Sequence, residues 1–439
     1  MEGEFYQMKE QNSNHDWIEI IKISLFALNL FMFCVIGFLF YLRPDTSILE
    51  KRTLAKFPDF TWNAFWDGSY FKQIDIWYSD TYPLREKMIG MSKKVESLYG
   101  VRDVQIVEGN INEIAKQAEN QKKEAESEVE EQLPDGTVRD IGEVRGSVYI
   151  VNNCGYEMYT FMEDLNMGFV ASMNLVYSRI KDKVDNMYVM LLPTGSGAML
   201  DKQVLDDMQC SDESVAMNYV YDRLNEGIHP VRTIDILRKH NAEYIYFHTD
   251  HHWTALGAYY AYTAFCKEKG WKPHDYNDYE KREFPNFLGS FYSYSRQSPA
   301  IAANPDTIIA YVPKGTNKMK MIMPNGVLED WEIISDATNY PTSSKYETFV
   351  GGDAPFSYAH NETITDGSSV VVIKDSMGNA FIPWLIDHYE YVYWIDARYT
   401  KNTISQMVKD YNIQDVIYEV GIYGASNAFL HKCYAEIGQ

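Results

Sequence analysis

Short apolar runs that alternate with helical patterns constrain the fold of this chain most strongly. The predicted strands are Val148–Val151, Met187–Leu192, Tyr244–Phe247, Val370–Ile373, Tyr391–Ile395 and Val416–Val420. The predicted helices are Asn174–Lys183, Ser214–Glu226, Thr254–Lys269, Ala380–Tyr389 and Thr403–Tyr411. Strands that are apolar on both faces and separated by helices are typical of a parallel sheet covered by helices. We therefore expect an α/β catalytic domain over residues 146–439, with its chemistry in loops at the carboxyl ends of strands.

A second constraint is the run from Ile23 to Leu42, which carries no formal charge. About twenty helical residues cross a hydrocarbon core of ~30 Å. A buried core helix is the alternative, but this run is apolar on every face. A cleaved signal peptide would have a shorter apolar core and a small-residue cleavage site. We predict a cytoplasmic tail over 1–22 and a single transmembrane anchor over 23–42.

The side of the membrane that holds the catalytic domain is also predicted. The basic residues that flank the anchor weakly favour the opposite orientation, but long domains translocate largely regardless of charge. We expect the domain to be extracellular or periplasmic.

Two segments separate the anchor from the main domain. Helical spacing and Pro83 suggest a helical entry region over 43–110. Residues 111–145 form a charged insertion, because the run from Lys116 to Gln132 has almost no large apolar side chains and Pro134-Asp135-Gly136 is a turn signature. We expect it to be an exposed helix or disordered; a coiled coil would need heptads that are missing.

Composition excludes some functions. The formal net charge of −22 argues against nucleic acid, which needs basic grooves, and against adhesion to anionic lipids by charge alone. None of the five cysteines forms a CxxC pair, so no zinc knuckle or redox motif is expected. The 34 tyrosines are compatible with sugar stacking, although ordinary packing explains them as well.

The first chemical motif follows the predicted strand at Tyr244–Phe247. Asp250 and His252 are two residues apart, so the carboxylate can accept the Nδ1 proton of the imidazole and leave Nε2 as a base. Trp253 is expected to pack behind the ring. Thr254 and Gly270 are suited to cap the next helix.

The second motif follows the predicted strand at Val370–Ile373. Ser376 lies at a strand-to-helix turn, where its hydroxyl can act as a nucleophile and nearby backbone N–H groups can stabilise an oxyanion. Asn379 is a candidate second donor to the oxyanion, and Gly378 is expected to let a substrate approach the backbone. Together the two motifs predict a Ser376, His252, Asp250 triad.

The run Asp250-His251-His252-Trp253 resembles the signature of the DHHW family of bacterial membrane-anchored proteins. Matching segments are residues 50–58, 67–70, 288–293 and 374–376. That family is similar to SGNH-like O-acetyltransferases of alginate and other exopolysaccharides, whose Asp-x-His pair and later serine correspond to Asp250, His252 and Ser376. The serine-last order implies an SGNH-hydrolase-like fold with a circularly permuted motif order. Here Lys374 replaces the glycine of the usual Gly-Asp-Ser motif, and the 111–140 insertion departs from the family pattern.

The resemblance implies O-acetyl transfer to an extracellular or cell-wall polysaccharide through a serine acyl-enzyme. A multispanning membrane acyltransferase would be the partner that supplies the acetyl group. A carbohydrate acetyl esterase, with the same triad, and a non-catalytic glycan-binding scaffold remain alternatives. No cofactor is implied.

Other residues are candidates for metal or substrate binding, and each has a simpler alternative role. His248, Asp250 and His252 have a spacing that could bind a metal, but no fourth ligand is evident and a serine explains the site better. His251 is expected to lie outside the proton relay. Arg398 and Tyr292 are candidate substrate-binding residues; the alternatives are a salt bridge of Arg398 to Asp396 or Asp375 and packing of Tyr292.

Overall fold

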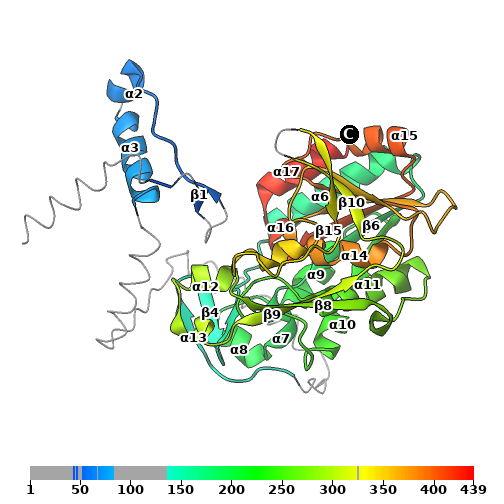
Figure 1. Ribbon diagram of the computed structural model, residues 1–439, viewed down its shortest axis with the longest axis horizontal. Helices are drawn as coiled ribbons and strands as arrows, with labels where there is room; N and C mark the ends of the chain where they lie inside the picture. The colour runs from blue at the N-terminus through cyan, green and yellow to red at the C-terminus, as the bar shows by residue number, and fades with distance from the viewer. Residues whose placement is uncertain (1–42, 45, 48–51, 67, 84–135, 324–325) are drawn as a thin grey trace, which may run out of the picture. The chain divides into compact units, whose positions relative to one another are not determined.

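The computed structural model describes residues 43–44, 46–47, 52–66, 68–83, 136–323 and 326–439 (Figure 1). The chain divides into two units, Met1–Val101 and Arg102–Gln439. The predicted anchor at 23–42 and most of the predicted insertion lie outside the described residues. Within the described part, no helix is long and apolar enough to cross a bilayer.

The described residues of the first unit form four short elements. They are β1 (Thr46–Ser47), β2 (Arg52–Thr53), α2 (Trp62–Trp66) and α3 (Ser69–Asp80). The guanidinium of Arg43 lies 3.7 Å from the ring centroid of Trp77 and donates to the Trp77 carbonyl at 3.2 Å. The end of α3 is therefore tied to the segment that precedes β1.

An eight-stranded sheet forms the centre of the second unit, in the order β11-β10-β12-β14-β13-β15-β6-β7. The strands are β6 (Asn186–Leu192), β7 (Ile228–Arg232), β10 (Lys318–Ile322), β11 (Leu328–Glu332), β12 (Ser357–His360), β13 (Ser369–Lys374), β14 (Tyr391–Asp396) and β15 (Asp415–Gly421). Strands β14, β13, β15, β6 and β7 pair in parallel, whereas β12, β10 and β11 extend the β14 edge in antiparallel fashion. The predicted α/β fold is confirmed, and the predicted parallel sheet is confirmed in part: the sheet is mixed and mostly parallel.

The central strands are buried because each of their two faces supports its own core. On β13, Val370 and Val372 join one hydrophobic cluster while Val371 and Ile373 join the other. All four side chains are 0% exposed, so each contributes about 1.5–3 kcal/mol of burial free energy. Helices therefore cover the sheet on both sides.

Helices α6 (Glu163–Ile180), α9 (Glu213–Tyr221), α15 (Ile404–Tyr411) and α17 (Ala428–Ile437) supply the cluster on one face. Helices α10 (Ile234–Lys239), α11 (Ala255–Lys269) and α14 (Ile382–Leu385) supply the cluster on the other. Figure 1 shows α6 and α17 on the opposite side of the sheet from α10 and α11. Thr254 caps α11 by accepting from Gly257 N at 3.3 Å, and Gly270 ends it with φ +78°, as the sequence predicted.

Two small sheets lie beside the main one. The first joins β3 (Glu143–Arg145), β4 (Val148–Val151) and β5 (Cys154–Tyr156); the second joins β8 (Glu280–Phe287) and β9 (Asp306–Val312). The remaining elements are α7 (Gly195–Met199), α8 (Lys202–Asp207), α12 (Ser290–Tyr294), α13 (Pro299–Ala302), α16 (Ile422–Ala425) and the 3₁₀ turns η2 (Tyr276–Asp278), η3 (Lys345–Thr348) and η4 (Ser376–Ala380). The predicted strand Val148–Val151 thus exists, but outside the main sheet.

The predicted strand Tyr244–Phe247 was wrong. This segment forms only an isolated bridge between Tyr246 and Trp253. Phe247 N donates to the His252 carbonyl at 3.2 Å, and Thr254 N donates to the Ile245 carbonyl at 2.9 Å. The Asp-His-His-Trp run therefore closes a loop on itself, and the core holds that loop through the buried side chains of Ile245 and Phe247.

Candidate active site

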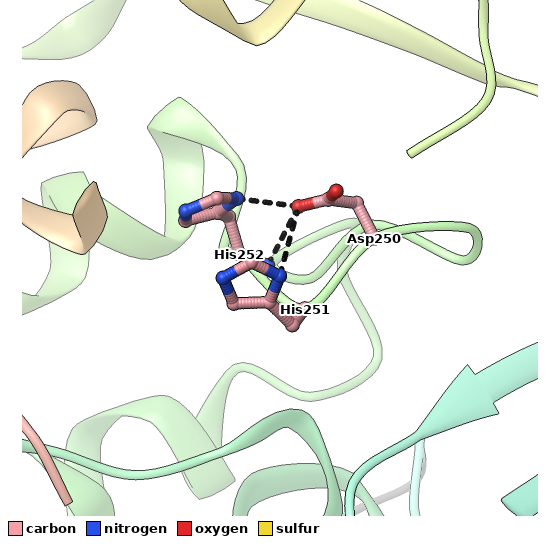
Figure 2. Close-up of side chains that lie close together, drawn as sticks. All are labelled: Asp250, His251 and His252. Carbon is pink, nitrogen blue, oxygen red and sulfur yellow. Dashed lines mark hydrogen bonds and ion pairs between the residues drawn. The ribbon is translucent and has the colours of Figure 1, made fainter. Parts of the chain in front are cut away.

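The Asp250 carboxylate holds His252 in one orientation. Asp250 Oδ1 lies 2.5 Å from His252 Nδ1 and also accepts from His252 N at 3.0 Å (Figure 2). Burial alone would raise the pKa of Asp250, but His252, His251 and the hydrogen bonds hold it well below its ordinary value. An ionised carboxylate only accepts hydrogen bonds, so the His252 proton lies on Nδ1 and Nε2 is left as an acceptor.

Ser376 lies on the other side of the imidazole. Its Oγ is 2.8 Å from His252 Nε2, so a continuous chain of hydrogen bonds runs from Asp250 through His252 to Ser376. Strand β13 ends at Lys374, and η4 begins at Ser376 itself. Asp375 pins this turn, because Oδ1 accepts from Met377 N at 2.9 Å and Oδ2 accepts from Gly421 N at 2.8 Å. The three side chains that the sequence singled out thus lie together.

Two aromatic residues brace the histidine against the serine turn. Tyr346 stacks on the His252 ring, with centroids 3.9 Å apart and planes 12° apart, and its hydroxyl donates to the Ser376 carbonyl at 3.0 Å. Trp253 is fully buried, and its Nε1 donates to the Met377 carbonyl at 2.9 Å. The sequence indicated Trp253 but not Tyr346, because η3 carries no local pattern that marks it.

Ser290 and Gly289 make the remaining contacts with the Asp250 carboxylate. Ser290 N donates to Asp250 Oδ2 at 2.6 Å, so both carboxylate oxygens are engaged. A Cβ at Gly289 would overlap the Asp250 side chain, which makes glycine a steric requirement there. The only signal of this role in the sequence was that both lie in the segment 288–293 resembling the DHHW family.

His251 lies beside the relay rather than within it. Its Nδ1 is 2.6 Å from Ser290 Oγ and 3.8 Å from Asp250 Oδ1. Figure 2 shows both imidazoles directing one ring nitrogen towards Asp250. These contacts are compatible with the prediction that His251 lies outside the proton relay.

The metal alternative rested on the spacing of His248, Asp250 and His252, but among the described residues the structure groups a different trio. His248 Nδ1 lies 3.2 Å from Asp306 Oδ1, and a different trio, Asp250, His251 and His252, places one ligand atom each within 4.8 Å of one another. Two ligands of a tetrahedral zinc ion stand ~3.4 Å apart, given zinc–ligand distances near 2.1 Å. The 2.5 Å separation of Asp250 Oδ1 and His252 Nδ1 fits a shared proton better than a shared cation.

The predicted oxyanion donors are used elsewhere. Asn379 is 2% exposed, and its Nδ2 donates to Asp353 Oδ1 at 3.1 Å. Met377 N and Gly378 N both donate to Asp375, within the turn. A Cβ at Gly378 would lie 2.6 Å from Lys374 Cβ, so this glycine serves packing rather than substrate access. The structure thus corrects the predicted roles of Asn379 and Gly378.

Arg398 and Tyr292 have different outcomes. Arg398 lines the cavity at Ser376, but its guanidinium is paired with Asp396 (Nε–Oδ1 2.9 Å) and with Asp353 (Nη2–Oδ2 2.7 Å). The salt bridge to Asp396, the simpler alternative, is therefore present. Tyr292 packs against the small cluster of Val148, Ile150, Phe291 and Ile301, away from the cavities at the site.

Two cavities meet at His251. The first, of about 250 Å³, opens at Ser376 and is lined by residues of several loops, including Glu157, Thr194, Gly421 and Tyr423. The second, of about 510 Å³, is lined mainly by apolar and aromatic side chains and reaches Asp250. The candidate nucleophile is therefore accessible from the first cavity.

The similar solved structures with TM-scores above 0.5 share this fold. A DHHW family protein from Eubacterium siraeum has a TM-score of 0.58 at 25% identity, over 67% of this chain and 98% of that one. Bacillus cereus PatB1 with a sulfonyl adduct has a TM-score of 0.55 at 18% identity, over 64% and 97% of the two chains. The O-acetyltransferase domain of Pseudomonas putida AlgJ has a TM-score of 0.37 at 11% identity, over 67% and 98%.

Sequence comparison points to one family. No curated protein sequence matches this chain. The family profile described as DHHW protein matches residues 50–133 and 121–395, which is more than half of the chain. The chain therefore belongs to the DHHW family.

Proposed function

We propose that this protein is a serine-dependent, SGNH-type O-acyl transferase that acts on a carbohydrate, with Ser376 as nucleophile, His252 as general base and Asp250 as its orienting carboxylate. The observation that carries the proposal is the chain of hydrogen bonds at 2.5 Å and 2.8 Å through one imidazole. A nucleophile, a base and an orienting group in this geometry suit acyl transfer. The serine-last order makes the motifs circularly permuted relative to ordinary SGNH esterases.

Each residue has a defined part in the reaction. His252 Nε2 accepts the proton of Ser376 Oγ as the oxygen attacks the acyl carbonyl, and the donor's leaving oxygen receives that proton. Asp250 stabilises the imidazolium that forms between these steps. A sugar hydroxyl then takes the acyl group from Ser376 by the reverse sequence. If water takes the place of the sugar, the same site is an esterase.

The location and partner are part of the proposal. We place the catalytic domain outside the cell membrane, anchored by Ile23–Leu42, where it would meet polysaccharide. A multispanning membrane acyltransferase is the proposed source of acetyl groups. The anchor, the side of the membrane and the acyltransferase partner are inferred from the sequence alone.

A labelling experiment tests the catalytic assignment. Full-length protein in detergent should hydrolyse p-nitrophenyl acetate, and a serine-reactive sulfonyl fluoride or organophosphonate should form one adduct, located on Ser376 by mass spectrometry. The Ser376→Ala variant should lose both hydrolysis and the adduct. A protein that neither hydrolyses the ester nor forms the adduct would instead support a non-catalytic, glycan-binding scaffold.

A further inference from the structure

The cavity at Ser376 contains groups that the proposed relay does not use. Glu157 follows β5, and its turn is held on both sides: Ser196 Oγ donates to the Glu157 carbonyl at 2.7 Å, and Tyr423 Oη donates to the Met158 carbonyl at 2.8 Å. Both Glu157 and Tyr423 line the cavity together with Ser376. Their positions are therefore set before any substrate binds.

The wall behind this turn is also ordered. Thr194, another lining residue, donates its backbone N–H to Glu213 Oε2 at 2.8 Å and its hydroxyl to Glu213 Oε1 at 2.5 Å. Glu213 is 1% exposed, so this acid supports the wall and does not face the cavity opening. Glu157 is half-buried and lines the cavity, and within the described part of the chain no hydrogen bond engages its carboxyl group.

The charges around the cavity disfavour an anionic ligand. Glu213, Asp250 and Asp375 are near enough to Glu157 to raise its pKa by repulsion. Among the described lining residues the only lysine or arginine is Arg398, and Asp353 and Asp396 already neutralise it. An anionic ligand would therefore find no unpaired cation to bind, whereas these carboxylates would not repel an uncharged ligand.

Tyr423 supplies a second kind of contact. Tyr423 is 40% exposed and lines the cavity. An exposed aromatic face beside a carboxyl group suits a sugar, because the C–H face of the ring packs on the aromatic surface while hydroxyls bond to the acid.

We propose that this cavity is the acceptor subsite for an uncharged sugar, with Glu157 hydrogen-bonding a sugar hydroxyl and Tyr423 packing against the sugar ring. This inference rests on the proposed function. The hydroxyl oxygen attacks the carbonyl carbon of the Ser376 ester and His252 Nε2 accepts its proton. The new ester bond forms on the sugar, the bond to Ser376 Oγ breaks, and the proton passes to Ser376 Oγ.

The protonation of Glu157 gives the subsite a pH dependence. Burial first, and then Glu213, Asp250 and Asp375, raise the pKa of Glu157 to about 8. Of the other charged groups at the cavity, Arg398 is paired and His251 is bonded to Ser290. Below pH 8 the neutral acid both donates and accepts a hydrogen bond; above it, the carboxylate only accepts. Transfer relative to hydrolysis should therefore fall as the pH rises through about 8.

The experiment measures transfer and hydrolysis together. Full-length protein in detergent receives p-nitrophenyl acetate and one of three acceptors: N-acetylchitopentaose, pentagalacturonate, or the methyl ester of pentagalacturonate, in which a small neutral ester replaces each carboxylate. Nitrophenol release reports formation of the acyl-enzyme, and mass spectrometry reports the acetylated sugar. We expect transfer to the neutral acceptors to exceed transfer to the free acid by roughly tenfold.

Variants separate the subsite from the triad. Glu157→Ala should lower transfer by roughly tenfold, the effect of one lost hydrogen bond, while the wild-type rate of nitrophenol release is largely kept. Glu157→Gln should keep transfer at pH 7, because an amide also donates and accepts, and should remove the fall near pH 8. Tyr423→Ala should weaken transfer, whereas Tyr423→Phe keeps the ring and should retain most of it.

The matched control is Glu163→Ala, an exposed glutamate bonded to Tyr219 Oη at 2.7 Å, which should change neither rate. Preferred acylation of the free acid, transfer in Glu157→Ala equal to wild type, or hydrolysis with no sugar in the panel acetylated would each overturn the subsite. Loss of nitrophenol release and of the Ser376 adduct in the wild-type protein would instead overturn the proposed function.

Discussion

Replacing Asp250 with asparagine should reverse the tautomer of His252. In the wild-type protein Oδ1 accepts from His252 Nδ1 and N, and Oδ2 accepts from Ser290 N. An asparagine has only one oxygen for these two positions. If its NH₂ faces His252, Nδ1 must become the acceptor, and the proton moves to Nε2. His252 can then no longer take the proton of Ser376.

The expected losses of activity and stability in Asp250→Asn follow from these contacts. Loss of the correct tautomer should lower kcat for ester hydrolysis by up to ~10⁴-fold, as in other serine triads. If the NH₂ instead faces Ser290, the half-buried Ser290 N–H loses its acceptor, which lowers the free energy of unfolding by up to about 1–3 kcal/mol. The variant should therefore be much less active and modestly less stable.

The pH dependence of stability provides a second readout. Because the pKa of Asp250 is lower in the folded than in the unfolded protein, its ionisation contributes stability above the unfolded value near 3.8, which is lost as the pH falls through the folded value. Asp250→Asn should remove this contribution.

The assay compares kcat for p-nitrophenyl acetate with urea unfolding at pH 7 and at acidic pH. Asp222→Asn makes the same chemical change at a side chain that is 66% exposed and should leave both measurements unchanged. An Asp250→Asn variant that is folded and within tenfold of wild-type activity would refute the role of Asp250.

Four further predictions concern the hydrogen-bond relay, the fit of Gly289, metal dependence and membrane topology. His252→Ala and Ser376→Ala should each lower ester hydrolysis by several orders of magnitude, and the double variant should be little worse, since the residues act as one unit. His251→Ala should lower hydrolysis by less than about tenfold. An inactive His251→Ala variant beside an active His252→Ala variant would show that Asp250 is paired with His251 instead. Gly289→Ala should lose most activity because its Cβ overlaps the Asp250 side chain, with circular dichroism to check that the fold is kept. Prolonged EDTA treatment should leave hydrolysis unchanged, and loss restored by zinc would favour a metal bound by Asp250, His251 and His252. Protease added to intact cells should digest the domain over 146–439, and full protection would reverse the proposed topology.

The central strands were predictable because runs of apolar residues in the sequence indicate their burial. Strands β6, β13 and β14 contain continuous apolar runs that need no partner to be recognised, and the run in β15 is interrupted only by the buried Glu419. Strands β7 and β8 were missed because Pro230 and Pro285 interrupt them and their exposed positions carry charge. The aromatic run at 244–247 was misassigned, since burial of apolar side chains does not distinguish a strand from a packed loop.

The site divides in the same way. Asp250 and His252 were marked by their spacing of two residues, and Ser376 by its place just after strand β13. Tyr346, Ser290 and the Glu157 turn lie in separate loops that meet only in the folded chain. The partner of Asn379 was unpredictable for the same reason, because Asp353 lies 26 residues away with no pattern that links them.

The order of strands in the main sheet has a consequence for biosynthesis. Strand β6 pairs with β15, and Asn186 bonds to Asp415, 229 residues later in the chain. At about 5–20 residues per second, β6 waits roughly 10–45 s for its neighbour to be made. Until then the edge of β6 that pairs with β15 carries unpaired backbone N–H and C=O groups, and such a high contact order slows folding. The nascent chain should therefore depend on chaperones, and a chain truncated before β15 should be degraded by protease at the rate of an unfolded polypeptide.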